Sequence, residues 1–126
     1  TIHAGEARGP ESIWEAIDKL GARRIGHGIT ATQDLKLMER LARDRILLET
    51  CPTSNYVTRS VNSFQEHPLP KFLAAGIPVS ISTDDPGIFG VTLTQEQAVA
   101  RKHMGLSIAD IAKTEEFASK HSFLKP

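Results

Sequence analysis

The stretch IPVSISTDDPG, residues 77–87, decides the fold because an apolar run leads directly into two adjacent carboxylates and a proline. Residues 77–81 have the short apolar pattern of a buried strand, and Asp84 and Asp85 follow its end. Neighbouring carboxylates repel each other unless a cation or a shared proton offsets their charge. A DDP sequence alone is about as typical of an Asx turn or a helix N-cap as of a functional site. Its interpretation therefore depends on the rest of the chain.

Three earlier segments repeat this design. Strand-like runs end at His3 and Glu6, at His27, and at CPTSN, residues 51–55, with helix-like segments between them. Alternation of strand and helix predicts parallel strands joined by right-handed crossovers, which is an α/β fold. Because parallel strands end at the same edge of a sheet, we expect these side chains to converge there. Consecutive side chains of an extended chain point opposite ways, so one aspartate would reach a metal and the next a neighbouring pocket.

The helix-like segments show amphipathic spacing. Residues 10–21 carry apolar side chains at helical intervals, with Pro10 suited to the first turn and Gly21 to a C-terminal stop. Residues 32–44 form a second apolar face, for which Thr32 is the expected N-cap. Further helices are expected over residues 67–76, 94–104 and 107–120.

The positions of the polar clusters favour a barrel over an open sheet. Clusters at successive strand ends are typical of the (β/α)₈ barrel, whereas the glycine-rich phosphate fingerprint of doubly wound nucleotide-binding sheets is absent. Four βα units amount to about half of a TIM (β/α)₈ barrel, whose usual size is around 250 residues. We therefore expect residues 1–126 to be a partial barrel domain, the C-terminal half, which needs a missing N-terminal half to cover its sheet edges.

Composition excludes several functional classes. The 126 residues have a formal net charge of zero and are 40% apolar, which is typical of one globular unit and leaves no strong electrostatic footprint for nucleic acid or membrane. No apolar run is long enough to span a bilayer. The single cysteine, Cys51, cannot form an internal disulfide, so a reducing, cytoplasmic location is predicted.

Each candidate residue also has a purely structural explanation. His3 and Glu6 could form a capped loop, and His27, between two glycines, could be a turn histidine. Cys51 is more typical of a small buried thiol, and Asn55 of a turn residue or one that orients a site. The coincidence of His, Glu, His and Asp-Asp at four consecutive strand ends favours shared chemistry over four separate explanations.

The motifs HAGE, RIGHG, CPTSN, HP and STDDPG, in this order and spacing, resemble the adenosine deaminase branch of the metal-dependent purine deaminases, bacterial members in particular. The resemblance implies a (β/α)₈ barrel that binds one zinc ion and hydrolytically deaminates adenosine or 2′-deoxyadenosine, giving the inosine counterpart and ammonia. The expected partner is therefore a small purine nucleoside.

The resemblance also implies a role for each matching residue. His3 and Asp84 match zinc ligands, and Glu6 matches the acid that protonates purine N1. His27 matches the residue that orients the metal-bound water and assists in its deprotonation, and Asp85 matches the contact to purine N7.

One departure and two alternatives remain. The family places two further zinc histidines in an H-x-H pattern, which does not occur in this chain, so those ligands are expected outside it and zinc binding by the chain alone should be weak. An adenine or AMP deaminase of the same superfamily is the nearest alternative. A non-catalytic barrel module with a vestigial site is the alternative from another class.

Overall fold

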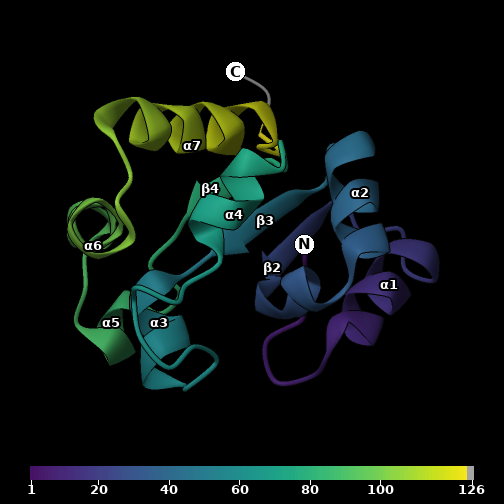
Figure 1. The fold of residues 1–126 in the computed structure, drawn as a ribbon, viewed down its shortest axis with the longest axis horizontal. Coiled ribbons are helices and arrows are strands. Elements are labelled where there is room, and N and C mark those ends of the chain that lie inside the picture. Colours follow the sequence, from purple (N-terminus) through teal and green to yellow (C-terminus); the bar gives the residue numbers. More distant parts are fainter. Residues whose placement is uncertain (125–126) are drawn as a thin grey trace.

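The structure is a computed structural model, and it describes residues 1–124. Its sheet contains four parallel strands: β1 (Ile2–Ala4), β2 (Arg24–His27), β3 (Leu47–Thr50) and β4 (Val79–Ile81). They lie in the order β1-β2-β3-β4, so each strand pairs with its neighbour in sequence (Figure 1). The prediction of an α/β fold with four successive βα units is confirmed.

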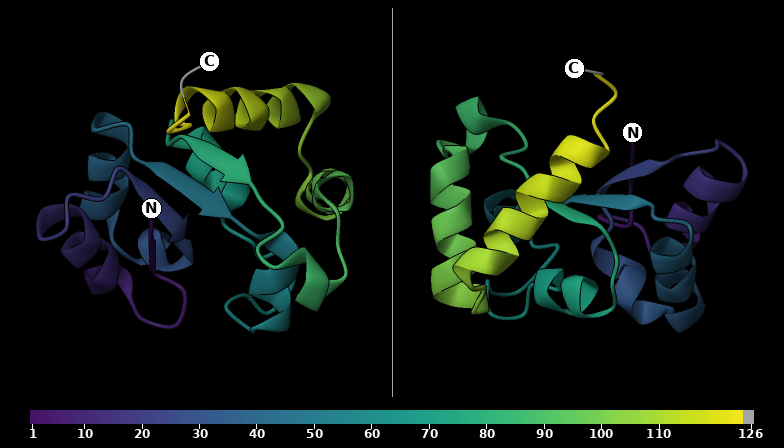
Figure 2. Two further views of the ribbon diagram at one scale, coloured as in Figure 1. Left: turned by 180° about the vertical axis from the view of Figure 1, so that it is seen from behind. Right: turned by 90° about the horizontal axis from the view of Figure 1, so that it is seen from above.

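Helices follow every strand. They are α1 (Pro10–Asp18), η1 (Ile29–Gln33), α2 (Leu35–Arg43), α3 (Pro52–Val57), α4 (Leu69–Ala74), α5 (Pro86–Phe89), α6 (Leu93–Met104) and α7 (Ile108–Lys120). The longer ones confirm the amphipathic patterns, and Gly21, with a φ of 64°, follows α1 as expected for a C-terminal stop. Figure 2 shows α6 and α7 as separate rods at the end of the molecule that contains β4. None of the helices in the described part of the chain is long and apolar enough to cross a membrane.

Strand register gives the sheet one apolar and one polar face. One row across the strands consists of Ile2, Ile25, Leu48 and Val79. The adjacent row consists of His3, Gly26, Glu49 and Ser80. Because successive residues of a strand face opposite sides, the apolar row packs on the helices and the other row faces away from them. This second face carries groups that would be costly to bury in an apolar core.

The core lies between the apolar row and the helices. Its fully buried side chains include Ile13 of α1, Leu37 and Leu41 of α2, and Phe72 of α4. Burying side chains of this size contributes roughly 1.5–3 kcal/mol each relative to leaving them in water. The core therefore holds the strands in register and fixes where their C-terminal ends lie.

The start of α2 differs from the prediction. Residues 29–33 form a short 3₁₀ turn, so Thr32 lies inside η1 and the N-cap of α2 is Asp34. Its carboxylate accepts from the amides of Lys36 (2.9 Å) and Leu37 (3.2 Å) and from the indole Nε1–H of Trp14 (2.9 Å). Asp34 thus caps one helix and ties it to another, which a local pattern does not reveal.

Candidate active site

All the predicted residues lie near the C-terminal ends of the strands, which form one edge of the sheet. His3 lies in β1 and Glu6 in the loop after it, while His27 is the last residue of β2. Asp84 and Asp85 follow β4 by three and four residues, in the turn that leads into α5. The convergence expected from parallel strands is therefore observed.

An unusual backbone aims His27 into this edge. Its φ is 67°, and Gly28 after it has a φ of 68°, so two consecutive residues adopt the left-handed conformation. Simple alternation along β2 would put His27 on the same side as Ile25, in the core, and the left-handed turn redirects it. A side chain at Gly28 would meet Leu48 at 2.7 Å, so the turn also requires glycine beside the histidine.

Asp84 is held in a second left-handed position. Its φ is 59°, and its Oδ2 accepts a 2.7 Å hydrogen bond from the Ser54 hydroxyl of α3. Non-glycine residues adopt this conformation at some energetic cost, and such outliers cluster at functional sites. Ser54 was not singled out from the sequence, because its contact joins residues 30 positions apart.

Asp85 caps a helix, which is one of the structural explanations given above for the DDP motif. It is the N-cap of α5, and its Oδ1 accepts from the amide of Ile88 at 3.0 Å. The side chain is exposed at the same edge as Asp84. A capping role leaves a carboxylate free to contact a ligand with its other oxygen, so the purine contact stays a prediction.

Two carboxylates face the same nitrogen of His27. Its Nε2 lies 3.4 Å from Oε2 of Glu6 and 4.0 Å from Oδ2 of Asp84. Burial lowers the pKa of His27, and it outweighs the two carboxylates, which act to raise it. Glu6 also accepts a hydrogen bond from the hydroxyl of Thr58 at 3.3 Å. This cluster brings two carboxylates within 4.0 Å of one imidazole nitrogen, the kind of grouping that acid–base chemistry uses.

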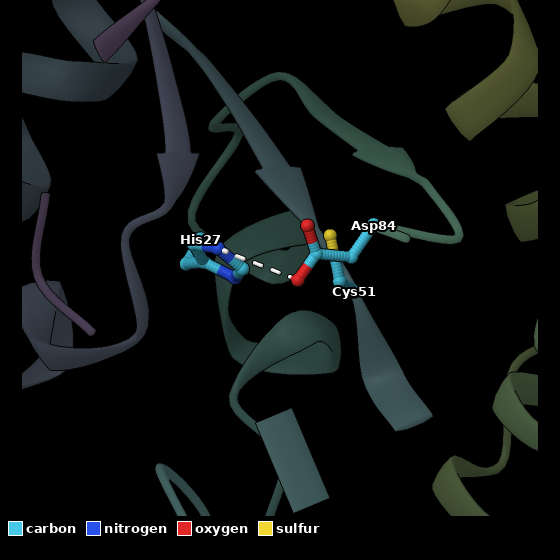
Figure 3. A group of neighbouring side chains, drawn as sticks. All are labelled: His27, Cys51 and Asp84. Carbon is cyan, nitrogen blue, oxygen red and sulfur yellow. Dashed lines mark ion pairs between the residues drawn. The ribbon is translucent and has the colours of Figure 1, made fainter. Parts of the chain in front are cut away.

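Three side chains offer atoms spaced for one metal ion. The ligand atoms of His27, Cys51 and Asp84 all lie within 4.8 Å of one another, and Figure 3 shows them converging from the ends of β2, β3 and β4. Burial raises the pKa of the Cys51 thiol to about 12, so this group is protonated at neutral pH, as predicted for a buried thiol.

His3 is not a member of that three-residue group, although its ring lies close to it. The centroids of the His3 and His27 rings are 5.0 Å apart, and the ring of His3 lies over Gly26, where a Cβ would meet its Cδ2 at 2.3 Å. The absence of a side chain on Gly26 thus leaves room for the imidazole. Imidazole nitrogens and carboxylate oxygens are the donors that zinc accepts, so His3 and Asp84 fit the predicted ion.

Comparison with known proteins agrees with this geometry. The adenosine deaminase family model matches residues 1–126. The chain is 48% identical over 124 residues to an adenosine deaminase of Shewanella loihica, covering 98% of this chain and 38% of that protein. It is 51% identical over 120 residues to an aminodeoxyfutalosine deaminase of Streptomyces coelicolor, covering 93% of this chain and 31% of that protein.

Solved structures show the same arrangement of elements. An adenine deaminase of Arthrobacter aurescens superposes with a TM-score of 0.94 at 34% identity, covering 98% of this chain and 38% of that one. A Zn-bound amidohydrolase of Burkholderia ambifaria superposes with a TM-score of 0.88 at 26% identity, covering 98% and 35%. The chain therefore spans about a third of the length of these relatives, in agreement with a partial (β/α)₈ barrel.

The fold and the cluster at its C-terminal edge define the class first: an α/β metal-dependent amidohydrolase. Within that class, the chain belongs to the adenosine deaminase family.

Proposed function

We propose that the protein containing this chain catalyses zinc-dependent hydrolytic deamination of adenosine or 2′-deoxyadenosine, giving inosine or 2′-deoxyinosine and ammonia. The observation that supports this most is the meeting of Glu6, His27 and Asp84 at the strand ends, with Nε2 of His27 facing both carboxylates. A zinc ion, when bound by His3, Asp84 and ligands outside the chain, would lower the pKa of water toward neutrality.

The residues of the chain divide the remaining work. Glu6 lies at the rim of the site and must hold a proton that it can donate to purine N1 as C6 becomes tetrahedral. His27 orients the attacking water from its buried position. Asp85, exposed beside Asp84, binds purine N7, and because both are acceptors in their usual forms a proton lies between them. The free, buried thiol of Cys51 supports a reducing, cytoplasmic compartment.

The substrate itself is a choice among related purines. The relatives of similar identity include an adenosine deaminase and an aminodeoxyfutalosine deaminase, and a solved relative is an adenine deaminase. The whole protein that contains this chain is called the gene-encoded protein below. Its initial rates, measured after zinc loading, on adenosine, adenine, AMP and aminodeoxyfutalosine separate these candidates. Adenosine should give the highest kcat/KM, and preference for another purine would reassign the substrate while keeping the chemistry. A protein that deaminates none of them would favour the non-catalytic alternative.

The role of Glu6 is tested by Glu6→Gln, which keeps the shape of the side chain but removes its transferable proton. We expect kcat to fall by about 10²–10⁴-fold with the fold intact, because general acid catalysis contributes that much. Glu39→Gln, on an exposed position of α2, is the matched control and should leave kcat unchanged. Wild-type turnover by Glu6→Gln would exclude the assigned mechanism.

A further inference from the structure

A buried chain of polar side chains runs beneath the candidate active site. It consists of His67, Asn55 and His27, which are 3%, 0% and 2% exposed. Asn55 contacts both histidines: its Oδ1 lies 3.2 Å from Nε2 of His67, and its Nδ2 lies 3.0 Å from Nδ1 of His27. Of these three side chains, His27 is the one that lies next to the two carboxylates, so Asn55 and His67 act on the site through His27.

The contacts of His67 set the direction of the hydrogen bonds among these three side chains. The amide of Leu69 donates to Nδ1 of His67 at 3.2 Å, so this nitrogen is an acceptor. Burial lowers the pKa of His67 to about 4, so the ring is neutral and carries its one hydrogen on Nε2. Nε2 of His67 therefore donates to Oδ1 of Asn55.

A backbone group fixes the Asn55 amide independently. The amide of Cys51 also donates to Oδ1, at 3.2 Å, so flipping the side-chain amide would set donors against donors at two contacts. The NH₂ group must then point at His27, and it can only donate. Nδ1 of His27 is consequently an acceptor, and the neutral ring carries its hydrogen on Nε2, the atom that faces Glu6 and Asp84.

We propose that Asn55 and His67 are positioning residues that hold His27 in its Nε2–H tautomer, so that His27 presents a hydrogen-bond donor to the carboxylates and to the reacting oxygen. In this tautomer Nε2 has no free lone pair, so the neutral ring orients its partners and does not itself take up the proton of the attacking water. This consequence for the reaction rests on the proposed function, whereas the tautomer itself does not.

The first test reads the tautomer directly in the gene-encoded protein. Long-range ¹⁵N–¹H NMR of ¹⁵N-histidine-labelled protein distinguishes protonated from unprotonated ring nitrogens, and His27→Gln identifies the signals of His27. Above the pKa of His27 we expect a protonated Nε2 and an unprotonated Nδ1. A protonated Nδ1 of His27 in the wild-type protein would overturn the proposal.

The second test reverses one hydrogen bond. In Asn55→Asp the new carboxylate has nearly the same shape but can only accept, so it requires a hydrogen on Nδ1 of His27. We expect the ¹⁵N signals to change to a protonated Nδ1 and kcat to fall by about 10–100-fold, the usual cost of losing a residue that orients a side chain at a metal site, with little change in KM. An unchanged tautomer together with unchanged kcat in a folded Asn55→Asp protein would contradict the proposal.

A conservative variant separates positioning from packing. Glutamine at position 67 places an N–H near the former Nε2, so His67→Gln should keep both the His27 tautomer and kcat, while His67→Phe fills the space without a donor and should lose both. Equal behaviour of the two variants would indicate a packing role and overturn the proposal for His67. If the wild-type protein deaminates no purine, the proposed function fails, and the NMR result alone decides the inference about the tautomer.

Discussion

Gly26 controls where the imidazole of His3 can lie. The two residues are partners in the β1–β2 register, and a Cβ on Gly26 would come within 2.3 Å of the His3 ring. Gly26→Ala should therefore displace the ring and weaken zinc binding by about 10–100-fold, the range seen when metal-ligand orientation is disturbed. Chelator competition on the gene-encoded protein measures this affinity.

A double variant shows whether the effect acts through His3. In a His3→Ala background the added methyl group has no ring to displace, so Gly26→Ala should cost little further zinc affinity, a strongly non-additive result. Equal losses in both backgrounds would mean that Gly26→Ala acts through the strand itself.

His67 should make stability depend on pH. Burial lowers its pKa from 6.5 to about 4, so above pH 6.5 both folded and unfolded chains hold it neutral. Between pH 6.5 and 4 only the unfolded chain binds the proton, so the free energy of unfolding falls as pH falls, by about 3 kcal/mol in total. Urea denaturation at several pH values measures this slope.

His67→Gln provides the reference for that measurement. It removes the titrating group but keeps the donor to Asn55, so the difference between the wild-type and variant curves isolates His67 from the carboxylates that titrate in the same range. Parallel curves from pH 7 to pH 4 would show that His67 is protonated equally in both states.

At the scale of elements, α3 joins the site to the rest of the fold. This six-residue helix carries Ser54, which contacts Asp84, and Asn55, which contacts His27. Its N-cap residue, Cys51, makes no side-chain capping bond, and the fully buried carboxylate of Glu96 in α6 accepts from the amide of Thr53 at 2.9 Å instead. The same carboxylate accepts from the Thr53 hydroxyl. A residue 43 positions away therefore caps this helix.

Removing that distant cap should loosen α3. Glu96→Ala leaves the amide of Thr53 without its acceptor, and we expect a loss of about 1–3 kcal/mol in the free energy of unfolding. The amides of residues 53–55 should also exchange with deuterium faster, while those of β3 keep their protection. Glu96→Gln retains an acceptor oxygen and is the matched control, with a smaller loss. Unaltered exchange at α3 in Glu96→Ala would show that its other contacts suffice.

The same helix marks the limit of prediction from sequence. The parallel strands, α1, α6 and α7 follow from local spacing and end signals, as does the meeting of His27 and Asp84 at one edge. In contrast, α3 and η1 are short and lack an amphipathic period, and α5 is a single turn after Pro86. Bonds to distant residues support α3, through Glu96, and η1, through the carbonyl of Gly5, and local patterns cannot indicate such partners.

At the scale of the whole molecule, the sheet has two open edges in the part of the chain that the structure describes. β1 pairs only with β2, and β4 only with β3. Beside the open edge of β1 lies a hollow of about 330 Å³, lined partly by Ile2, His3, Glu6 and the exposed Leu20. Unpaired strand edges next to apolar side chains favour association with other chains. The predicted zinc ligand His3 thus lies where the sheet is least protected.

The 126-residue chain on its own should therefore behave differently from the gene-encoded protein. The relatives it matches are about two and a half to three times as long, and the chain contains no H-x-H pair to add to His3 and Asp84. With at most part of a four-ligand zinc site, the isolated chain should bind zinc much more weakly and self-associate through its strand edges. Metal analysis after dialysis and light scattering measure the two properties. Asp84→Ala should remove whatever zinc affinity the isolated chain keeps. A monomeric chain that retains one zinc ion as tightly as the gene-encoded protein would mean that His3, His27, Cys51 and Asp84 form a complete site by themselves.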